Sequence, residues 1–224
     1  ENLRIMTEMS NKLKQHMDLQ FKTSVQDILV EDHHATGIVL ENGQTIHAKK
    51  VVLAPGRDGS AWLTKVLSNQ GLKLYNNQVD IGVRVETSNI VMEEINKNLY
   101  EGKFVYNTSV GTKVRTFCSN PSGHVVIENH SGTMLANGHA YHDPKLGSKN
   151  TNFALLVSHT FSEPFNEPNE FAHEISRLAN KLSNGSVIVQ RYGDIKRGRR
   201  TTYKRLKEGY TEPTLPEAVP GDLG

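Results

Sequence analysis

The segment 51–67, VVLAPGRDGSAWLTKVL, constrains the fold more than any other stretch of the chain. It opens with four apolar residues, turns at a proline and a glycine, and continues with apolar residues at helical spacing. A short apolar run that ends at a glycine junction is typical of a strand buried on both faces. We therefore expect a buried strand over 51–54 and a helix over 59–71, with Asp58 as its N-cap.

Strand–glycine–helix junctions often hold phosphates or cofactors, because the N–H groups at a helix N-terminus attract anions. Gly56-Arg57-Asp58-Gly59 has this arrangement. The same four residues also suit a plain strand-to-helix turn that uses glycine for its geometry. The residues alone leave these two interpretations about equal.

The chain before this junction predicts one helix and a small antiparallel sheet. Residues 2–16 fit an amphipathic helix whose apolar stripe we expect to pack in the core, and the stripe consists of Leu3, Met6, Met9 and Leu13. Residues 18–31 alternate apolar and polar positions and predict one bent strand or two short ones. Asn42-Gly43, between TGIVLE and QTIHA, is a strong signal for a two-residue hairpin.

The character of the sequence changes near residue 75. We expect a strand over 79–87, a helix over 89–100, strands and turns through 104–161, and a helix over 167–182. The inward face of the last helix is expected to carry Phe171, Ile175, Leu178 and Leu182. The pattern predicts an α+β protein with two domains, residues 1–76 and 77–224, of which the second is β-rich with a mixed sheet and flanking helices.

Composition narrows the class of protein. The chain has 224 residues and a formal net charge of +2, which by itself gives no argument for a nucleic-acid partner. Its single cysteine, Cys118, excludes an internal disulfide and favours a reducing, cytoplasmic compartment. No apolar run approaches the roughly 20 residues that span a bilayer, so we expect no membrane insertion. Glu1 opens the chain inside a helical stripe, and we expect a piece of a longer protein.

Several segments resemble flavoproteins of the glutathione-reductase type. VVLAPGRDGS, residues 51–60, is similar to the strand with an Ala-Thr-Gly-like turn that follows the antiparallel meander of their FAD-binding domain, with Pro55 where threonine is usual. The order of further motifs resembles the bacterial NAD(FAD)-utilising dehydrogenases: GRDGSAWL, IGVRVE, VRTFCSNPSGHVV, NGHAYHD, TNFALLVS and PTLPEAVPGDL. This resemblance runs from Val25 to Leu223.

The resemblance implies an FAD-dependent oxidoreductase that transfers hydride through the flavin, with NAD(P)H as a possible co-substrate. It implies cofactor contacts from Val25, Ala54, Gly56 and Arg57. The G-x-G-x-x-G fingerprint that such a domain needs for the pyrophosphate is absent from the sequence. On this interpretation the chain is a central part of the enzyme, inactive when isolated, and its catalytic acid or base, substrate and oligomeric state are not predicted.

Three further positions have a functional and a structural interpretation. Arg84 could bind an anionic substrate or cofactor, or be a solvated or glutamate-paired charge on a strand, which we favour slightly. Cys118 could lie near the flavin, or be a small buried apolar residue, which we favour. His139, His142 and Asp143 lack the second matching half of a zinc site, so we expect no metal.

The basic run 196–207, KRGRRTTYKRLK, carries the alternative function. Seven of its twelve residues are lysine or arginine. It could hold RNA or another polyanion in a non-catalytic binding module. A solvated loop is the more common role of such a run, so we expect no nucleic-acid partner. Hydrolase, nucleoside-triphosphatase, zinc-protease and EF-hand motifs are absent from the sequence.

Overall fold

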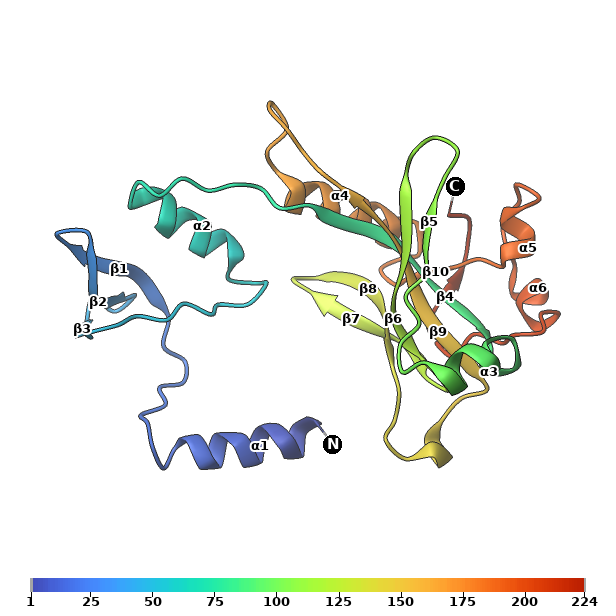
Figure 1. The fold of residues 1–224 in the computed structure, drawn as a ribbon, viewed down its shortest axis with the longest axis horizontal. Helices are drawn as coiled ribbons and strands as arrows, with labels where there is room; N and C mark the ends of the chain where they lie inside the picture. Colours follow the sequence, from blue (N-terminus) through green and yellow to red (C-terminus); the bar gives the residue numbers. More distant parts are fainter. Residues whose placement is uncertain (1, 224) are drawn as a thin grey trace. The chain divides into compact units, whose positions relative to one another are not determined.

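The computed structural model describes residues 2–223, and the chain divides into two compact units between Leu74 and Tyr75. Unit 1 is the part up to Leu74, and unit 2 begins at Tyr75. Helices and antiparallel strands occur in both units, which confirms the α+β class (Figure 1). The assignment of residues 1–76 to an FAD-binding domain and of 77–224 to a substrate domain stays a prediction.

Unit 1 is a three-stranded antiparallel meander with two helices. The strands pair in the order β1-β2-β3, and the elements are α1 (Asn2–Leu13), β1 (Val25–Glu31), β2 (His34–Leu40), β3 (Thr45–His47) and α2 (Ser60–Asn69). Its buried apolar residues are Ile28, Leu40 and Val66. Trp62 Nε1 donates a hydrogen bond to the carbonyl of Gln26 at 3.1 Å, which ties the first turns of α2 to β1.

The hairpin between β2 and β3 is confirmed, but its turn is longer than predicted. The Leu40 N–H bonds to the Gln44 carbonyl at 2.8 Å, which leaves three residues in the loop. Gly43 takes a φ of +83°, the left-handed conformation that closes three-residue hairpins. Asn42 Oδ1 accepts a hydrogen bond from the Gln44 N–H. The Asn-Gly pair thus makes the turn, with one extra residue before it.

The predicted buried strand over 51–54 is wrong. These residues form no strand, and the Val52 side chain is 89% exposed. The apolar run needs neighbouring strands on both sides, and the sheet of unit 1 consists of β1, β2 and β3 alone within the described chain. The predicted cap is also wrong, because Gly59, not Asp58, is the N-cap of α2, and it makes no side-chain cap bond.

The apolar stripe of α1 is exposed, contrary to our expectation that it packs in the core. Leu3 is 80% exposed and Met6 64%, and no residue of α1 is buried. The helical spacing therefore predicted the helix correctly, but not its surroundings. A stripe of this kind packs only where a second apolar surface faces it, and none in the described part of unit 1 does so.

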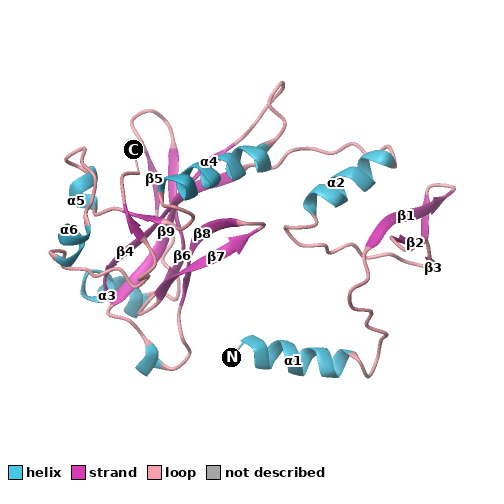
Figure 2. Cartoon of the chain, turned by 180° about the vertical axis from the view of Figure 1, so that it is seen from behind, coloured by secondary structure: helices cyan, strands magenta, loops and turns pink. Residues whose placement is uncertain are grey.

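Unit 2 is built on a four-stranded antiparallel sheet with the strand order β4-β9-β6-β5 (Figure 2). A separate hairpin, β7-β8, and a short parallel pair, β10-β11, complete its strands. The bounds are β4 (Val79–Ser88), α3 (Asn89–Asn98), β5 (Val105–Asn107), β6 (Lys113–Asn120), β7 (His124–His130), β8 (Thr133–His139), a 3₁₀ turn η1 (Pro144–Leu146), β9 (Asn150–His159), α4 (Pro168–Leu182), β10 (Ile188–Val189), α5 (Tyr192–Ile195), α6 (Tyr203–Lys207) and β11 (Val219–Pro220).

The small apolar core of unit 2 joins the hairpin to the last third of the chain. It consists of Val125, Val187 and Leu215, with Ile127, Met134 and Ala218 packed against it. Polar side chains occupy more of the buried interior than apolar ones do, and Thr151, Asn152 and Thr201 are fully buried. Unit 2 is therefore held together to a large extent by hydrogen bonds.

Helix α4 bonds to the hairpin through Asn180, and not through the end of its predicted apolar face. Leu178 and Leu182 are 61% and 63% exposed, so the prediction is wrong for these two. Phe171, in contrast, packs on the rings of His159 and Phe161. Asn180 explains the orientation: its amide accepts from the Met134 N–H and donates to the Met134 carbonyl, both at 2.8 Å. These two bonds satisfy backbone groups of β8 that would otherwise be unpaired.

Within residues 2–223, every helix is too short or too polar to pass through a bilayer.

Candidate functional site

The four residues predicted to contact a cofactor lie in unit 1, one at the start of its sheet and three in the connection before α2. Val25 is the first residue of β1 and is half-buried. Ala54, Gly56 and Arg57 lie in the connection before α2 and are exposed. All four belong to one unit, and neither the pocket lined by His34, His47 and Lys49 nor the pocket beside α3 includes any of them.

The turn at residues 55–59 has a defined geometry. Gly56 has a φ of +70°, which disfavours every residue with a side chain. A Cβ at Gly59 would lie 2.4 Å from the Cβ of Pro55, so the close approach of these two residues requires glycine. The turn leads directly into the ten-residue helix α2, where the Ser60 N–H bonds to the Arg57 carbonyl at 3.1 Å and the N–H groups of Ala61 and Trp62 follow at the helix N-terminus. This arrangement can accept an anion, and whether it does so stays a prediction.

A second candidate lies in unit 2, where the sheet brings Arg84 against two other strands. Arg84, on β4, donates from Nε to Asn152 Oδ1 at 2.9 Å and from Nη2 to the same oxygen at 2.5 Å. Nη2 also donates to the carbonyl of Cys118 at 2.8 Å. Burial lowers the pKa of the Arg84 guanidinium below its ordinary value. Arg84 is half-buried and bonds to neutral oxygens, with a weaker electrostatic attraction from Glu86, so the interpretation that we favoured from the sequence, a solvated or glutamate-paired charge, does not describe its main contacts.

The carbonyl of Cys118 is aimed at Arg84 by a bulge in β6. Between Phe117 and Asn120 the pairing with β9 shifts by one residue, and Cys118 takes a φ of +49°. Glu101 holds this conformation, since its carboxylate accepts from the Cys118 N–H at 2.8 Å. Asn120 Nδ2 donates to the Cys118 carbonyl at 2.9 Å and lies 3.6 Å from its Sγ. Cys118 is thus half-buried at a bulge and not a plain apolar residue of a strand.

Gly138 of β8 closes the cluster from the hairpin side. A Cβ at this position would lie 1.8 Å from Arg84 Nη2 and 2.1 Å from Asn152 Oδ1, so no side chain fits here. Asn152 is fully buried, and its Nδ2 has no acceptor within the described chain. We call Arg84, Glu101, Cys118, Asn120, Gly138 and Asn152 the Arg84 cluster. The Arg84 guanidinium bonds to the neutral oxygens of Asn152 and Cys118, while the Glu101 carboxylate bonds to the Cys118 N–H, and a guanidinium held in this way can attract an anionic or electron-rich group.

Sequence reasoning singled out Arg84 and Cys118 but missed the other members of the Arg84 cluster. Asn152 and Gly138 lie inside motifs quoted for the family resemblance, TNFALLVS and NGHAYHD, but nothing in those motifs gave them a role. A run of polar residues in the sequence could have indicated these members. Strand β9 begins with Asn150-Thr151-Asn152, three residue types that are rarely buried in a row. A run of this kind at the start of a strand indicates a hydrogen-bonded interior.

Two arginines of the basic run 196–207 form ion pairs with a buried aspartate of unit 2. Asp194, on α5, is 1% exposed, and its carboxylate accepts from Arg199 Nε at 2.6 Å, from Thr201 Oγ1 at 2.7 Å and from Arg205 Nε at 3.2 Å. Burial by itself raises the pKa of this carboxyl. The hydrogen bonds from Thr201 and the two arginines outweigh burial and lower the pKa to about 2. Two arginines of the run therefore have a structural role, and nothing here favours a polyanion site.

In the run NGHAYHD, Asp143 has a local structural role. Asp143 caps the 3₁₀ turn η1 by accepting from the Lys145 N–H at 3.0 Å. Across residues 2–223, no group of three or more histidine, cysteine, aspartate and glutamate side chains is placed to hold a metal ion.

The comparisons with known proteins agree with part of this assignment. Residues 2–86 match the family model described as glucose inhibited division protein A, which is a family of FAD-binding oxidoreductases. The match covers unit 1, including Val25, Ala54, Gly56 and Arg57, and the first strand of unit 2. A search of curated proteins found no match. The N-terminal part of the chain is therefore similar to glucose inhibited division protein A, which supports an FAD-dependent family for this protein.

Proposed function

We propose that this chain is part of an FAD-dependent oxidoreductase that transfers hydride between a substrate and the flavin. The match of residues 2–86 to an FAD-binding oxidoreductase family carries this proposal. The turn before α2 supports it, because Gly56 in the left-handed conformation and a following helix N-terminus suit a phosphate group.

In this proposal unit 1 holds the adenosine and phosphate end of FAD. Val25 offers backbone groups at the start of β1, and Ala54 and Gly56 offer backbone groups without a large side chain to obstruct approach. Arg57 supplies a guanidinium, which fits phosphate oxygens in a bidentate manner. Bound flavin would accept and release the hydride, and the residues of this chain would bind and orient it. NAD(P)H as the co-substrate remains part of the proposal.

The single cysteine supports a reducing, cytoplasmic compartment, and we propose that location.

The test is a titration of FAD fluorescence with the full chain, with riboflavin in parallel. We expect saturable quenching of FAD and none of riboflavin, because riboflavin lacks the phosphates and adenosine that unit 1 would bind. Arg57→Ala should weaken FAD binding by roughly 10- to 150-fold, since hydrogen bonds to charged groups contribute about 1.5–3 kcal/mol. Lys65→Ala removes an exposed charge from α2 and serves as the matched control.

Two results would contradict the proposal. One is the absence of saturable FAD quenching by a chain that circular dichroism shows to be folded. The other is equal weakening by Arg57→Ala and Lys65→Ala, which would indicate a general charge effect and not a contact made by the turn.

A further inference from the structure

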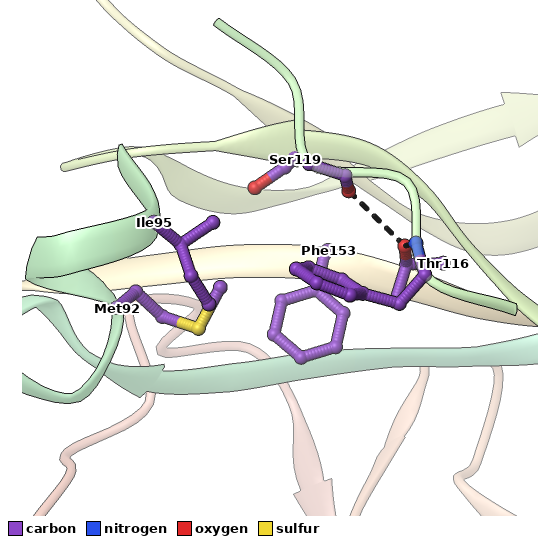
Figure 3. A pocket seen from close by; sticks show the side chains of 7 residues that line it. Met92, Ile95, Thr116, Ser119 and Phe153 are labelled. Atoms are coloured by element: carbon purple, nitrogen blue, oxygen red, sulfur yellow. Dashed lines mark hydrogen bonds between the residues drawn. The ribbon is translucent and has the colours of Figure 1, made fainter. Parts of the chain in front are cut away.

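A pocket lies in unit 2 between helix α3 and the four-stranded sheet, on the face of the sheet opposite the Arg84 side chain. Its volume is about 210 Å³. Figure 3 shows α3 on one side, with Met92 and Ile95 directed inward, and the Phe153 ring of β9 at the base. The remaining lining residues are Gly102, Phe104, Thr116 and Ser119. The sheet register separates the two sites, because Val85 pairs with Phe153 while Arg84 pairs with Ala154.

The lining excludes charged ligands. Its side chains are apolar except for two hydroxyl groups, and no residue with a formal charge contributes to it. An ion that entered would lose its hydration without gaining a partner charge, which is strongly unfavourable. The two phenylalanine rings and the Met92 thioether favour an aromatic ring, because edge-to-face ring pairs and sulfur–ring contacts are both attractive.

The two hydroxyl groups differ in their availability. Thr116 Oγ1 is engaged, since it accepts from the Phe104 N–H at 2.8 Å and donates to the Gly102 carbonyl at 3.1 Å. No hydrogen bond of Ser119 Oγ is found within the described chain. Figure 3 shows this hydroxyl directed toward the Ile95 side of the pocket. Ser119 therefore offers the pocket one polar group that can donate or accept.

The position of Ser119 is built into the fold. It follows Cys118 in the bulge of β6, and the Glu101 carboxylate fixes that bulge through the Cys118 N–H. Gly102, next to Glu101, leaves room at the wall, since a Cβ there would lie 3.0 Å from both Ile95 Cγ2 and Phe104 Cε2. The Glu101 carboxylate thus fixes the bulge that carries the Ser119 hydroxyl, and the next residue, Gly102, leaves space at the pocket wall.

We propose that this pocket binds a neutral compound with a single aromatic ring and one hydroxyl or carbonyl group, which hydrogen-bonds to Ser119. Size sets the upper limit, because apolar cavities near 150 Å³ bind benzene and those of drug-sized ligands begin near 300 Å³. A volume of about 210 Å³ suits one substituted ring and is small for the three fused rings of a flavin. The pocket is lined by residues of unit 2, and the proposed FAD contacts belong to unit 1.

The experiment is a titration of the full chain, labelled with ¹⁵N, with p-cresol, toluene and p-toluate, followed by two-dimensional NMR. We expect saturable binding of p-cresol, with the largest shifts at the lining residues. Toluene should bind roughly 3- to 10-fold more weakly because it lacks the hydroxyl group. The anion p-toluate should show no saturable binding.

Two variants test the assignment to this pocket. Ser119→Ala removes one oxygen and should reduce the affinity for p-cresol to that for toluene, roughly 3- to 10-fold, with toluene unaffected. Ser162→Ala, at an exposed loop of the same unit, is the matched control and should change neither affinity. Ile95→Phe fills the space and should reduce the affinity for both neutral compounds by more than 10-fold, in a chain whose thermal unfolding shows that it is folded.

Several results would overturn the proposal. These are the absence of saturable p-cresol binding at millimolar concentration, equal affinities for p-cresol and toluene, binding of p-toluate, and retention of p-cresol binding by folded Ile95→Phe. If Ile95→Phe fails to fold, Ser119→Ala still decides the question, because it changes a single oxygen. FAD binding is measured separately, so failure here leaves the proposed function of unit 1 standing.

Discussion

The two units of this chain are stabilised by different chemistry. Unit 1 buries three apolar side chains, Ile28, Leu40 and Val66, and exposes an apolar stripe on α1. In unit 2 the buried polar residues outnumber the buried apolar ones, and they bond to one another and to the backbone. Burial of apolar area tolerates small shifts, whereas hydrogen bonds require fixed geometry. Unit 2 is therefore the better place to look for a precisely shaped site.

The largest effect that we predict tests the small core of unit 1. Leu40 is 2% exposed, and Leu40→Ala should reduce the free energy of unfolding of unit 1 by about 2–5 kcal/mol. Tryptophan fluorescence follows this unit, because Trp62 is the one tryptophan of the sequence and bonds to β1. Urea unfolding measured by NMR signals of unit 2 should keep its midpoint. A shift of both transitions together would show that the two units unfold as one.

The second prediction tests the fixed geometry of unit 2. Gly138→Ala places a methyl group on Arg84 Nη2 and Asn152 Oδ1, so we expect a loss of about 2–4 kcal/mol in urea unfolding. Gly193→Ala is the control, since its nearest contact would be an ordinary 3.4 Å, and it should stay within about 0.5 kcal/mol. A Gly138→Ala chain as stable as the control would mean that the Arg84 cluster rearranges freely.

The third and smallest effect is a contribution to stability that is lost in acid. The pKa of Asp194 is about 2 in the folded chain, below the roughly 3.9 of an unfolded aspartate. Its carboxylate therefore stabilises unit 2 above pH 4, and this contribution is lost as the pH falls from about 4 to about 2. Asp194→Asn should be less stable than the parent at pH 6, and the difference in urea midpoint should shrink toward pH 3. A constant difference would exclude titration of this group.

The elements of the fold were largely predictable because they depend on local spacing. Strand β4, helix α3 and the hairpin at Asn42-Gly43 all lie where the periodicity and the turn residues indicated them. The prediction of a strand over 51–54 was wrong because a strand buried on both faces depends on neighbouring strands, and the local sequence pattern does not show whether they are present. Helix α4 lies where it was predicted, but part of its predicted inward face was wrong for a related reason. The bonds of Asn180 to β8 determine which residues contact the hairpin, and they are not visible in the local pattern.

The candidate sites were less predictable than the elements. Arg84 was recognised because it interrupts an apolar strand, but its partners come from β6, β8 and β9, and no spacing in the sequence brings them together. Ser119 was quoted in a motif without a role. Its exposure to the pocket follows from the bulge, which is a property of strand register and not of composition.

That bulge has a consequence for how the strand can change. Three steps along β6, from Phe117 to Asn120, match two steps along β9, from Ala154 to Asn152. The surplus residue reverses the alternation of sides, so that Phe117 and Asn120, an odd number of positions apart, share one face. Deleting one residue between Phe117 and Asn120 would restore regular pairing and leave both flanking residues with their β9 partners and on their present face. The surplus residue therefore adds what a regular strand cannot offer at this point: a backbone carbonyl bonded to Arg84 together with a hydroxyl at the pocket beside α3.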